Sequence, residues 1–452
     1  MLTGPFLFGA LVVAIAFIVV ATTRFKLHPF LALLITAYGM GLCGGLSPAQ
    51  TITALTGGFG KTVGYIGIVI ACGCIIGIVL EKSGCALVLG EMMLRLIGRK
   101  RAVLAMSCTG ALVSIPVFCD SGYVILSPLN RSLARQTGLS LATFAVALSM
   151  GLYATHCLVP PTPGPLAVAG ELRADMGTVI LLGLLVVVPV VVTTLAYAQF
   201  AGRRIFIDPN QGVPSPPIAS QAEARPAHGA FAAFSPILFP VLFIAAKSVA
   251  DFPGRPLGDG VRRAGLGLLG EPNTALALGV LLAWFVVRRH GCETFSSWCG
   301  DGLRDAGTII LITAAGGAFG SVLRETPLAK LLGDGLASLD LGRWNILLPF
   351  IVAAGLKTAI GSSTVAMITT ASLISPLLPS MGLATGFGPA LTTLAIASGG
   401  MMVSHANDSF FWVIAQLSRM TVAQGYCLIT VASAVAGLTG IAVVLLLSLM
   451  LL

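Results

Sequence analysis

The sequence contains two copies of one pattern, and this duplication restricts the fold more than any other feature. Residues 57–94 align with residues 300–337 at a constant offset of 243, without a gap. Identical pairs within and beyond this alignment include Gly73 with Gly316, Gly77 with Gly320, Leu80 with Leu323, Ser127 with Ser375, and His156 with His405. A repeated unit of this size predicts two equivalent halves, an organisation that is frequent in secondary transporters.

Composition places the duplicated chain in a membrane. Of its 452 residues, 56% are hydrophobic and only 10% are charged, whereas about 25% are charged in soluble domains. Several apolar runs approach the roughly 20 residues that a helix needs to cross a bilayer. Basic residues are dispersed beside these runs, which argues against a nucleic-acid partner. We therefore predict an all-α polytopic protein with about ten to twelve segments in the lipid bilayer.

A polar, proline-rich stretch divides the chain. We predict a first transmembrane repeat at 1–200, a cytoplasmic linker at 201–235 and a second transmembrane repeat at 236–452. Short clusters of lysine and arginine mark cytoplasmic loops and place the N-terminus outside. The first repeat then crosses an odd number of times, so the second begins from the opposite side. The repeat is predicted to be inverted.

Each repeat holds two stretches that are too rich in glycine, proline or polar residues for a continuous membrane helix. We interpret residues 114–122 and 357–364 as tips of re-entrant hairpins, and residues 156–165 and 404–409 as helix breaks. Non-helical backbone at membrane depth persists only where protein or a water-filled cavity satisfies its polar groups. These four stretches are therefore predicted to line a transport pathway.

The first break holds four prolines and a glycine within Pro160–Pro165, so no continuous helix passes through it. Free amide groups and the positive end of a helix at such a break can bind an anion. We predict substrate contacts from His156, Pro161, Thr162 and Gly164. The alternative is a surface loop whose prolines are structural.

The second break places polar side chains between two apolar runs. His405 and Asn407 are predicted to donate hydrogen bonds to the substrate, and Asp408 to take up a coupling proton. A charge in the membrane is costly unless it is paired or functional. The alternative is a turn at the membrane interface.

Asp120, in the first hairpin tip, is the second predicted proton carrier, because a desolvated carboxyl group is readily protonated. A structural hydrogen bond to backbone amides is the alternative. In the second tip, the backbone and hydroxyl groups of Gly361, Ser362, Ser363 and Thr364 are predicted to bind a substrate carboxylate.

Other charged residues have less specific interpretations. Lys357 either extends to an interface or supplies positive charge to an anionic substrate. The neighbours Glu81-Lys82 and Arg324-Glu325 follow equivalent helices and are expected to form ion pairs at the membrane edge. Neither a His-Glu-x-x-His nor a Gly-x-Ser-x-Gly motif occurs in the sequence, so we expect no enzyme, metal or cofactor.

Together these motifs resemble the gluconate permease family, the gluconate:proton symporters of the ion transporter superfamily, over nearly the full chain. The motifs that carry the resemblance are LEKSG at 80–84, IPVFCD at 115–120, PPTPGP at 160–165, GSSTV at 361–365 and HANDS at 405–409. The resemblance implies proton-driven uptake of gluconate or a related small sugar acid or hydroxycarboxylate across the bacterial inner membrane, by alternating access. It also implies a homodimer. A sodium-coupled or passive carrier of another short hydroxy acid, or of a D-serine-like solute, is the alternative.

Overall fold

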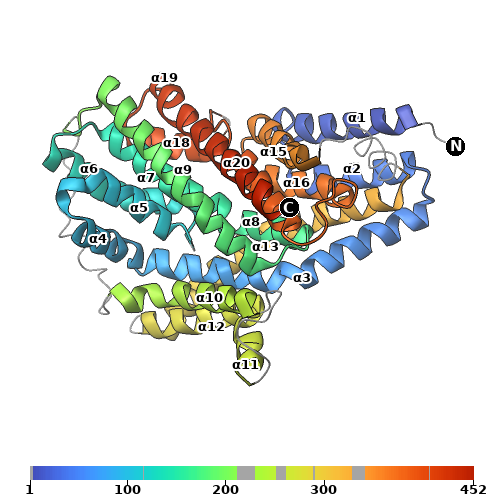
Figure 1. Cartoon of the computed structure of the whole chain (residues 1–452), viewed down its shortest axis with the longest axis horizontal. Helices are drawn as coiled ribbons and strands as arrows, with labels where there is room; N and C mark the ends of the chain where they lie inside the picture. Colours follow the sequence, from blue (N-terminus) through green and yellow to red (C-terminus); the bar gives the residue numbers. More distant parts are fainter. Residues whose placement is uncertain are drawn as a thin grey trace.

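Every regular element of the described chain is a helix (Figure 1). The computed structural model describes residues 4–115, 117–210, 230–250, 261–288, 291–327, 342–406 and 408–452. The first half forms α1 (Gly4–Thr23), α2 (Pro29–Cys43), α3 (Pro48–Lys82), α4 (Cys85–Ile97), α5 (Ala102–Val113), α6 (Cys119–Thr137), α7 (Leu141–Leu158), α8 (Pro163–Glu171) and α9 (Met176–Arg204). The second half forms α10 (Ala230–Ala250), α11 (Val261–Leu269), α12 (Pro272–Val287), α13 (Cys292–Glu325), α15 (Leu347–Ile360), α16 (Ser363–Ile374), α17 (Gly388–Gly400), α18 (Ser409–Leu417), α19 (Val422–Gly425) and α20 (Val431–Leu451).

The two halves are interlocked around the long helices α3 and α13, which have 35 and 34 residues. These helices pack along each other in antiparallel directions, because Gly58 of α3 faces Ser321 of α13 whereas Gly302 of α13 faces Ile75 of α3. Helix α2 packs on α13 of the other half, and α12 packs on α3. Each half thus packs a helix on the long helix of the other half, and this symmetry corresponds to the sequence repeat.

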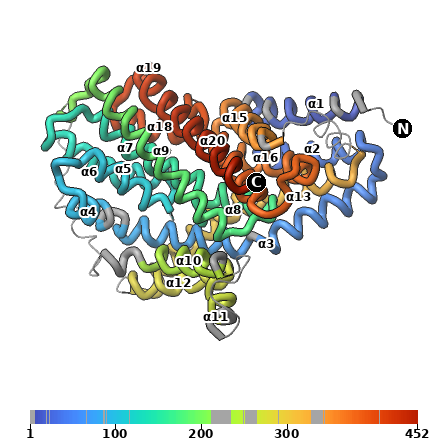
Figure 2. The backbone as a smooth tube through the Cα atoms, in the orientation of Figure 1, coloured from blue at the N-terminus to red at the C-terminus, as the bar shows by residue number. Residues whose placement is uncertain are grey.

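The remaining helices repeat the same packing order in each half. Helix α5 packs on α7 and α7 on α9, just as α15 packs on α17 and α17 on α20. Figure 2 shows the resulting arrangement, with α10, α11 and α12 on one side of α3 and most of the other helices on the opposite side. Every residue of helix α7 is buried. A helix that is apolar on all sides is expected in such a position.

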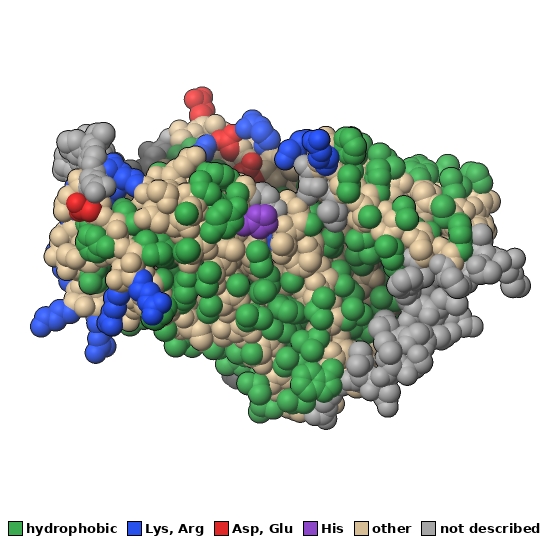
Figure 3. Space-filling model, turned by 90° about the horizontal axis from the view of Figure 1, so that it is seen from above, with side chains coloured by type: hydrophobic (Ala, Val, Ile, Leu, Met, Phe, Trp, Pro, Cys, Tyr) green, Lys and Arg blue, Asp and Glu red, His purple; other side chains and the backbone are tan. Residues whose placement is uncertain are grey.

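Four helical segments of the described chain are long and apolar enough to cross a membrane: Leu141–Glu171, Met176–Arg204, Cys292–Glu325 and Val422–Leu451. A fifth span is formed if Pro48–Tyr65 and Gly67–Lys82, bent by 47°, are taken together. The described residues also form six shorter apolar helices of 10–17 residues, and the ten to twelve membrane segments stay a prediction. Apolar side chains cover much of the face shown in Figure 3, and lysine and arginine side chains gather near its margins.

The structure confirms a helix interruption in each of the four predicted stretches. Helix α5 ends before Ser114 and α15 before Gly361, and each is followed within a few residues by its hairpin partner, α6 or α16. Helix α7 ends at Leu158 before α8, and α17 ends at Gly400 before α18. The prolines of 160–165 and the left-handed backbone of Gly361 account for two of the interruptions, and after α17 the backbone is left-handed at Val403.

The connection between the two halves has fewer residues than the linker predicted at 201–235. Helix α9 continues through Arg204, and α10 already begins at Ala230. After α9 the chain packs back on the helices: Ile207 N donates to Ser140 Oγ at 2.9 Å, and Arg135 Nε donates to the Pro209 carbonyl at 3.0 Å. Residues 211–229 of the linker, and 251–260 in the second half, lie outside the described residues.

Glycines allow α5 and α7 to approach closely, which gives a testable prediction. A Cβ atom at Gly151 would lie 2.2 Å from the Ser107 carbonyl oxygen, and one at Gly110 would lie 2.5 Å from that of Leu148. Because backbone cannot move aside cheaply, Gly151→Ala should destabilise the protein by about 1–3 kcal/mol. We expect a lower midpoint of thermal unfolding in detergent.

Gly39→Ala is the matched control. Gly39 also lies within a helix, but no atom of the described chain lies within 4 Å of its added Cβ. Alanine there should be neutral or stabilising by up to about 1 kcal/mol. Equal midpoints for the Gly151 and Gly39 variants would contradict this account of the α5–α7 contact.

Candidate functional site

The four helix interruptions converge on one polar cavity of about 240 Å³. The packing of α6 against α18 joins the first hairpin tip to the second break, and α16 against α8 joins the second tip to the first break. The cavity is lined by Cys119, Asp120, Tyr153, His156, Ile360, Gly361, Ser362, Ser363, Thr364, Asp408, Ser409 and Phe410. Segments far apart in the sequence therefore form one site.

Three helices begin at this cavity and direct their positive ends toward it. The first residues of α6, α16 and α18 are among its lining residues. Helix α8 begins beside the second tip, where a Cβ atom at Gly164 would lie 3.8 Å from Thr364 Oγ1. Each N-terminus has unpaired amide groups and a partial positive charge. The cavity is thus suited to a small anion.

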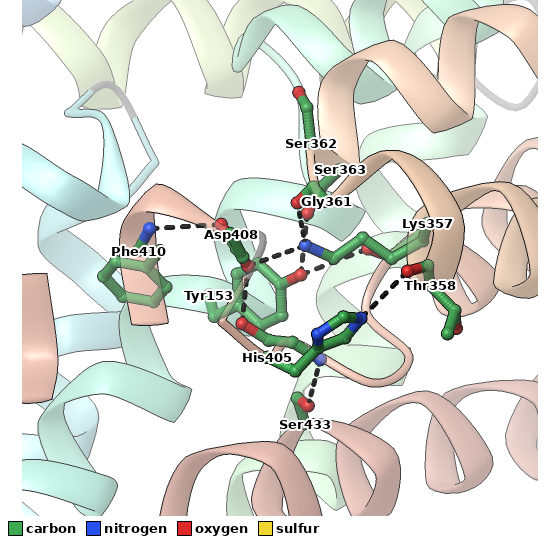
Figure 4. Close-up of polar contacts among 12 residues, drawn as sticks. Tyr153, Lys357, Thr358, Gly361, Ser362, Ser363, His405, Asp408, Phe410 and Ser433 are labelled. Atoms are coloured by element: carbon green, nitrogen blue, oxygen red, sulfur yellow. Dashed lines mark hydrogen bonds and ion pairs between the residues drawn. The ribbon is translucent and has the colours of Figure 1, made fainter. Parts of the chain in front are cut away.

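A buried ion pair joins the second tip to the second break (Figure 4). Lys357 Nζ lies 2.6 Å from Asp408 Oδ2 and also donates to the Gly361 carbonyl. The Lys357 side chain is 0% exposed and that of Asp408 is 7% exposed. Lys357 itself does not line the cavity, so it neutralises Asp408 from behind the cavity wall.

Asp408 also has two neutral donors. Ser404 Oγ donates to its Oδ2 at 2.5 Å, and the backbone N–H of Phe410 donates to its Oδ1 at 3.1 Å. The second contact makes Asp408 the N-cap of α18. One cation and two neutral donors thus satisfy both oxygens of this carboxylate.

Tyr153 connects α7 to the second tip. Its hydroxyl group donates to the Gly400 carbonyl at 3.1 Å, and it therefore accepts from Ser363 Oγ, which lies 2.7 Å away. The ring also faces Lys357, whose Nζ lies 6.0 Å from the ring centroid. Tyr153 thus holds the tip next to the buried ion pair.

Two polar atoms at the cavity have no hydrogen-bond partner within the described residues: Asp120 Oδ1 and His156 Nδ1. Both atoms are buried, and the His156 ring packs against Phe118 with 5.9 Å between ring centroids. An unpaired buried polar group is costly. These two atoms are therefore available to a proton or to a polar solute.

The cavity brings together seven of the residues predicted from the sequence: Asp120, His156, Gly361, Ser362, Ser363, Thr364 and Asp408. Pro161, Thr162, Gly164 and His405 do not line it. Thr162 Oγ1 donates to the Val159 carbonyl at 2.6 Å and so shapes the break. His405 Nε2 lies 2.9 Å from the Thr358 carbonyl. Asn407 lies outside the described residues.

Sequence reasoning missed Tyr153, Cys119 and Phe410, and it did not pair Lys357 with Asp408. A signal existed for Tyr153, which precedes His156 by three residues and so lies on the same face of α7. The expected pairs Glu81-Lys82 and Arg324-Glu325 were wrong. Lys82 pairs with Asp301, and Arg324 with Glu171.

Comparison with known proteins shows the family of the chain. The sequence model of the GntP family permeases matches residues 7–450. The chain belongs to this family. A gluconate permease of Pseudomonas aeruginosa is 33% identical over 98% of each chain. The D-serine transporter DsdX of Escherichia coli K12 is 32% identical over 97% of this chain and 98% of its own.

The fold of this permease is also similar to a solved structure. The YdaH transporter of Alcanivorax borkumensis, described as having an unusual topology, matches 93% of this chain and 98% of its own with a TM-score of 0.65 and 16% identity. The protein is therefore an all-α, multi-pass membrane transporter and not an enzyme.

Proposed function

We propose that this permease is a proton-coupled symporter that imports gluconate or a related small hydroxycarboxylate across the bacterial inner membrane. The observation that carries the proposal is the cavity at which three helix N-termini meet beside an unpaired acid, Asp120. Gluconate and D-serine, named for the two relatives, each carry a carboxylate and at least one hydroxyl group. The helix ends suit the carboxylate, and the hydroxyl groups of Ser362, Ser363 and Thr364 suit the polar remainder.

The charges around the cavity support coupling to a proton. Lys357 already neutralises Asp408. The negative charge that would repel a bound anion is therefore that of Asp120. In a site of low dielectric constant, two like charges repel strongly. Protonation of Asp120 removes this repulsion. We therefore assign the proton to Asp120, and assign Asp408 to the ion pair that holds the site together.

Uptake into proteoliposomes tests this proposal. Labelled gluconate should accumulate against its gradient when an inward proton gradient is imposed, and an inward sodium gradient should have no effect. Competition with hydroxy acids of three to six carbons, and with D-serine, would rank the substrates. Accumulation driven only by sodium would support sodium coupling, and strictly downhill flux would support a passive carrier. Either result would overturn the proton-coupled assignment.

A further inference from the structure

A second charged cluster lies at the other end of the two short helices that meet the substrate cavity. Glu171, the last residue of α8, accepts from Arg324 of α13, with 2.8 Å between Oε1 and the guanidinium nitrogen. The Glu171 side chain is only 7% exposed, whereas that of Arg324 is 39% exposed. The pair therefore joins α8 to one of the two long helices.

The Glu171 carboxylate lies against two glycines of α13. A Cβ atom added at Gly317 would lie 3.2 Å from Glu171 Oε2, and one at Gly320 would lie 3.2 Å from Oε1. Ser375, just beyond α16, donates to the Glu171 carbonyl at 3.2 Å. One residue thus ties the ends of both α8 and α16 to α13.

Helices α8 and α16 connect this cluster to the substrate cavity. Gly164 and Thr364 are close at their N-terminal ends, and Glu171 and Ser375 at their C-terminal ends. At 1.5 Å per residue, the nine residues of α8 span about 13 Å. A movement of either helix along α13 would therefore change the cavity and the ion pair together.

The space around the ion pair offers it alternative partners. A polar cavity of about 530 Å³ surrounds it, and Lys61, Arg173 and Glu325 are among its lining residues. Glu171 could exchange Arg324 for another cation if α8 moved. The opposite end of the long helices differs, because Asp301 pairs there with Lys82 and Arg304, which all belong to α3 and α13.

We propose that the Glu171–Arg324 pair is a latch that stabilises the conformation described here and opens when the substrate cavity turns to the other side of the membrane. The latch rests on the proposed function only in that transport requires two conformations. At the other end of α3 and α13, no described ion pair joins these helices to α6 or α18, the counterparts of α16 and α8, so the latch favours one of the two conformations.

Thiol labelling of the full-length protein in proteoliposomes tests the latch without any substrate. Ser362→Cys is the reporter, because Ser362 is exposed and lines the substrate cavity. The signal of the parent chain, with its native cysteines, is subtracted. Opening the latch with Glu171→Gln or Arg324→Gln should slow labelling by a membrane-impermeant maleimide roughly 5-fold, when the maleimide is added on the side to which Ser362 is exposed in the conformation described here. Five-fold is the lower end of conformational coupling, and Arg324 is partly solvated.

The double variant and two further chains separate a latch from a local packing effect. Glu171→Gln with Arg324→Gln should slow labelling no more than either change alone, because both remove the same interaction. Gly320→Ala should also slow it, by displacing the carboxylate without removing a charge. Lys82→Gln, which breaks the other ion pair, should leave the labelling rate unchanged. Size-exclusion profiles establish that each variant is folded.

Unchanged labelling in both single variants, additive effects in the double variant, or an equal effect of Lys82→Gln would overturn the latch. These outcomes are independent of the transport assay. If the wild-type protein failed to accumulate any hydroxycarboxylate while the labelling rates followed the expected pattern, the proposed function would be wrong and the latch would stand.

Discussion

Lys357→Met should abolish uptake, and adding Asp408→Asn to the same chain should restore part of it. The single change leaves the Asp408 carboxylate buried without its cation. Removing one partner of a buried ion pair typically costs about 3–5 kcal/mol, and both side chains are almost fully buried here. The double variant replaces the pair with neutral groups, so the uncompensated charge disappears. Uptake and the midpoint of thermal unfolding should fall together in the single variant and recover together in the double variant.

The control for this prediction is Lys100→Met, since Lys100 is an exposed lysine in the short turn between α4 and α5. That change should alter neither measurement. If the double variant were as unstable as Lys357→Met, the loss would come from the packing of the lysine side chain rather than from its charge. If Lys357→Met transported normally, the ion pair would have no part in the site.

Asp120→Asn should eliminate accumulation against a gradient but preserve exchange of substrate across the membrane. In the wild-type protein the loaded carrier needs a protonated Asp120, so uptake should fall as the external pH rises. Asparagine is neutral at every pH and cannot release a proton inside. Exchange between labelled and unlabelled substrate should therefore persist in the variant. It should not depend on pH over the pH range in which wild-type uptake falls. Counterflow in proteoliposomes at several pH values measures both effects.

Asp408→Asn provides the contrast, because it should impair exchange as well as accumulation. That variant leaves Lys357 as a buried cation without its anion, although asparagine can still cap α18. Normal proton-driven accumulation by Asp120→Asn would show that the coupling proton binds elsewhere. Retained pH dependence of exchange in that variant would show the same.

The positions of the helix interruptions could be predicted because their causes are local. Proline lacks an N–H group and glycine tolerates the left-handed backbone, which accounts for the interruptions at 160–165 and at Gly361. The repeat then placed the equivalent interruptions in the other half. Residues from all four interruptions line one cavity, among them Asp120, His156 and Asp408, and their roles in transport stay predictions.

The side-chain partners could not be predicted, because they depend on how rigid helices are rotated against one another. Lys357 and Asp408 lie on different helical segments, and nothing in either local sequence indicates that they meet. The prediction for Glu81-Lys82 failed for a definable reason: adjacent residues on a helix point in different directions and do not face each other. Each charge instead pairs across a helix contact, as Lys82 does with Asp301. At the first break, the Thr162 side chain is oriented by its hydrogen bond to the Val159 carbonyl, and it does not line the cavity.

The exchange of partners between the halves has a consequence for biosynthesis. Helix α3 packs on α13 and α12, which are made more than 200 residues later. At about 5–20 residues per second, a ribosome needs on the order of ten seconds or more to complete them. During this interval the surface of α3 that α12 and α13 later cover has no partner, so lipid, the insertion machinery or a chaperone must cover it. A messenger truncated after the linker would yield a half-protein destined for degradation, whereas separate synthesis of both halves in one cell should allow them to assemble.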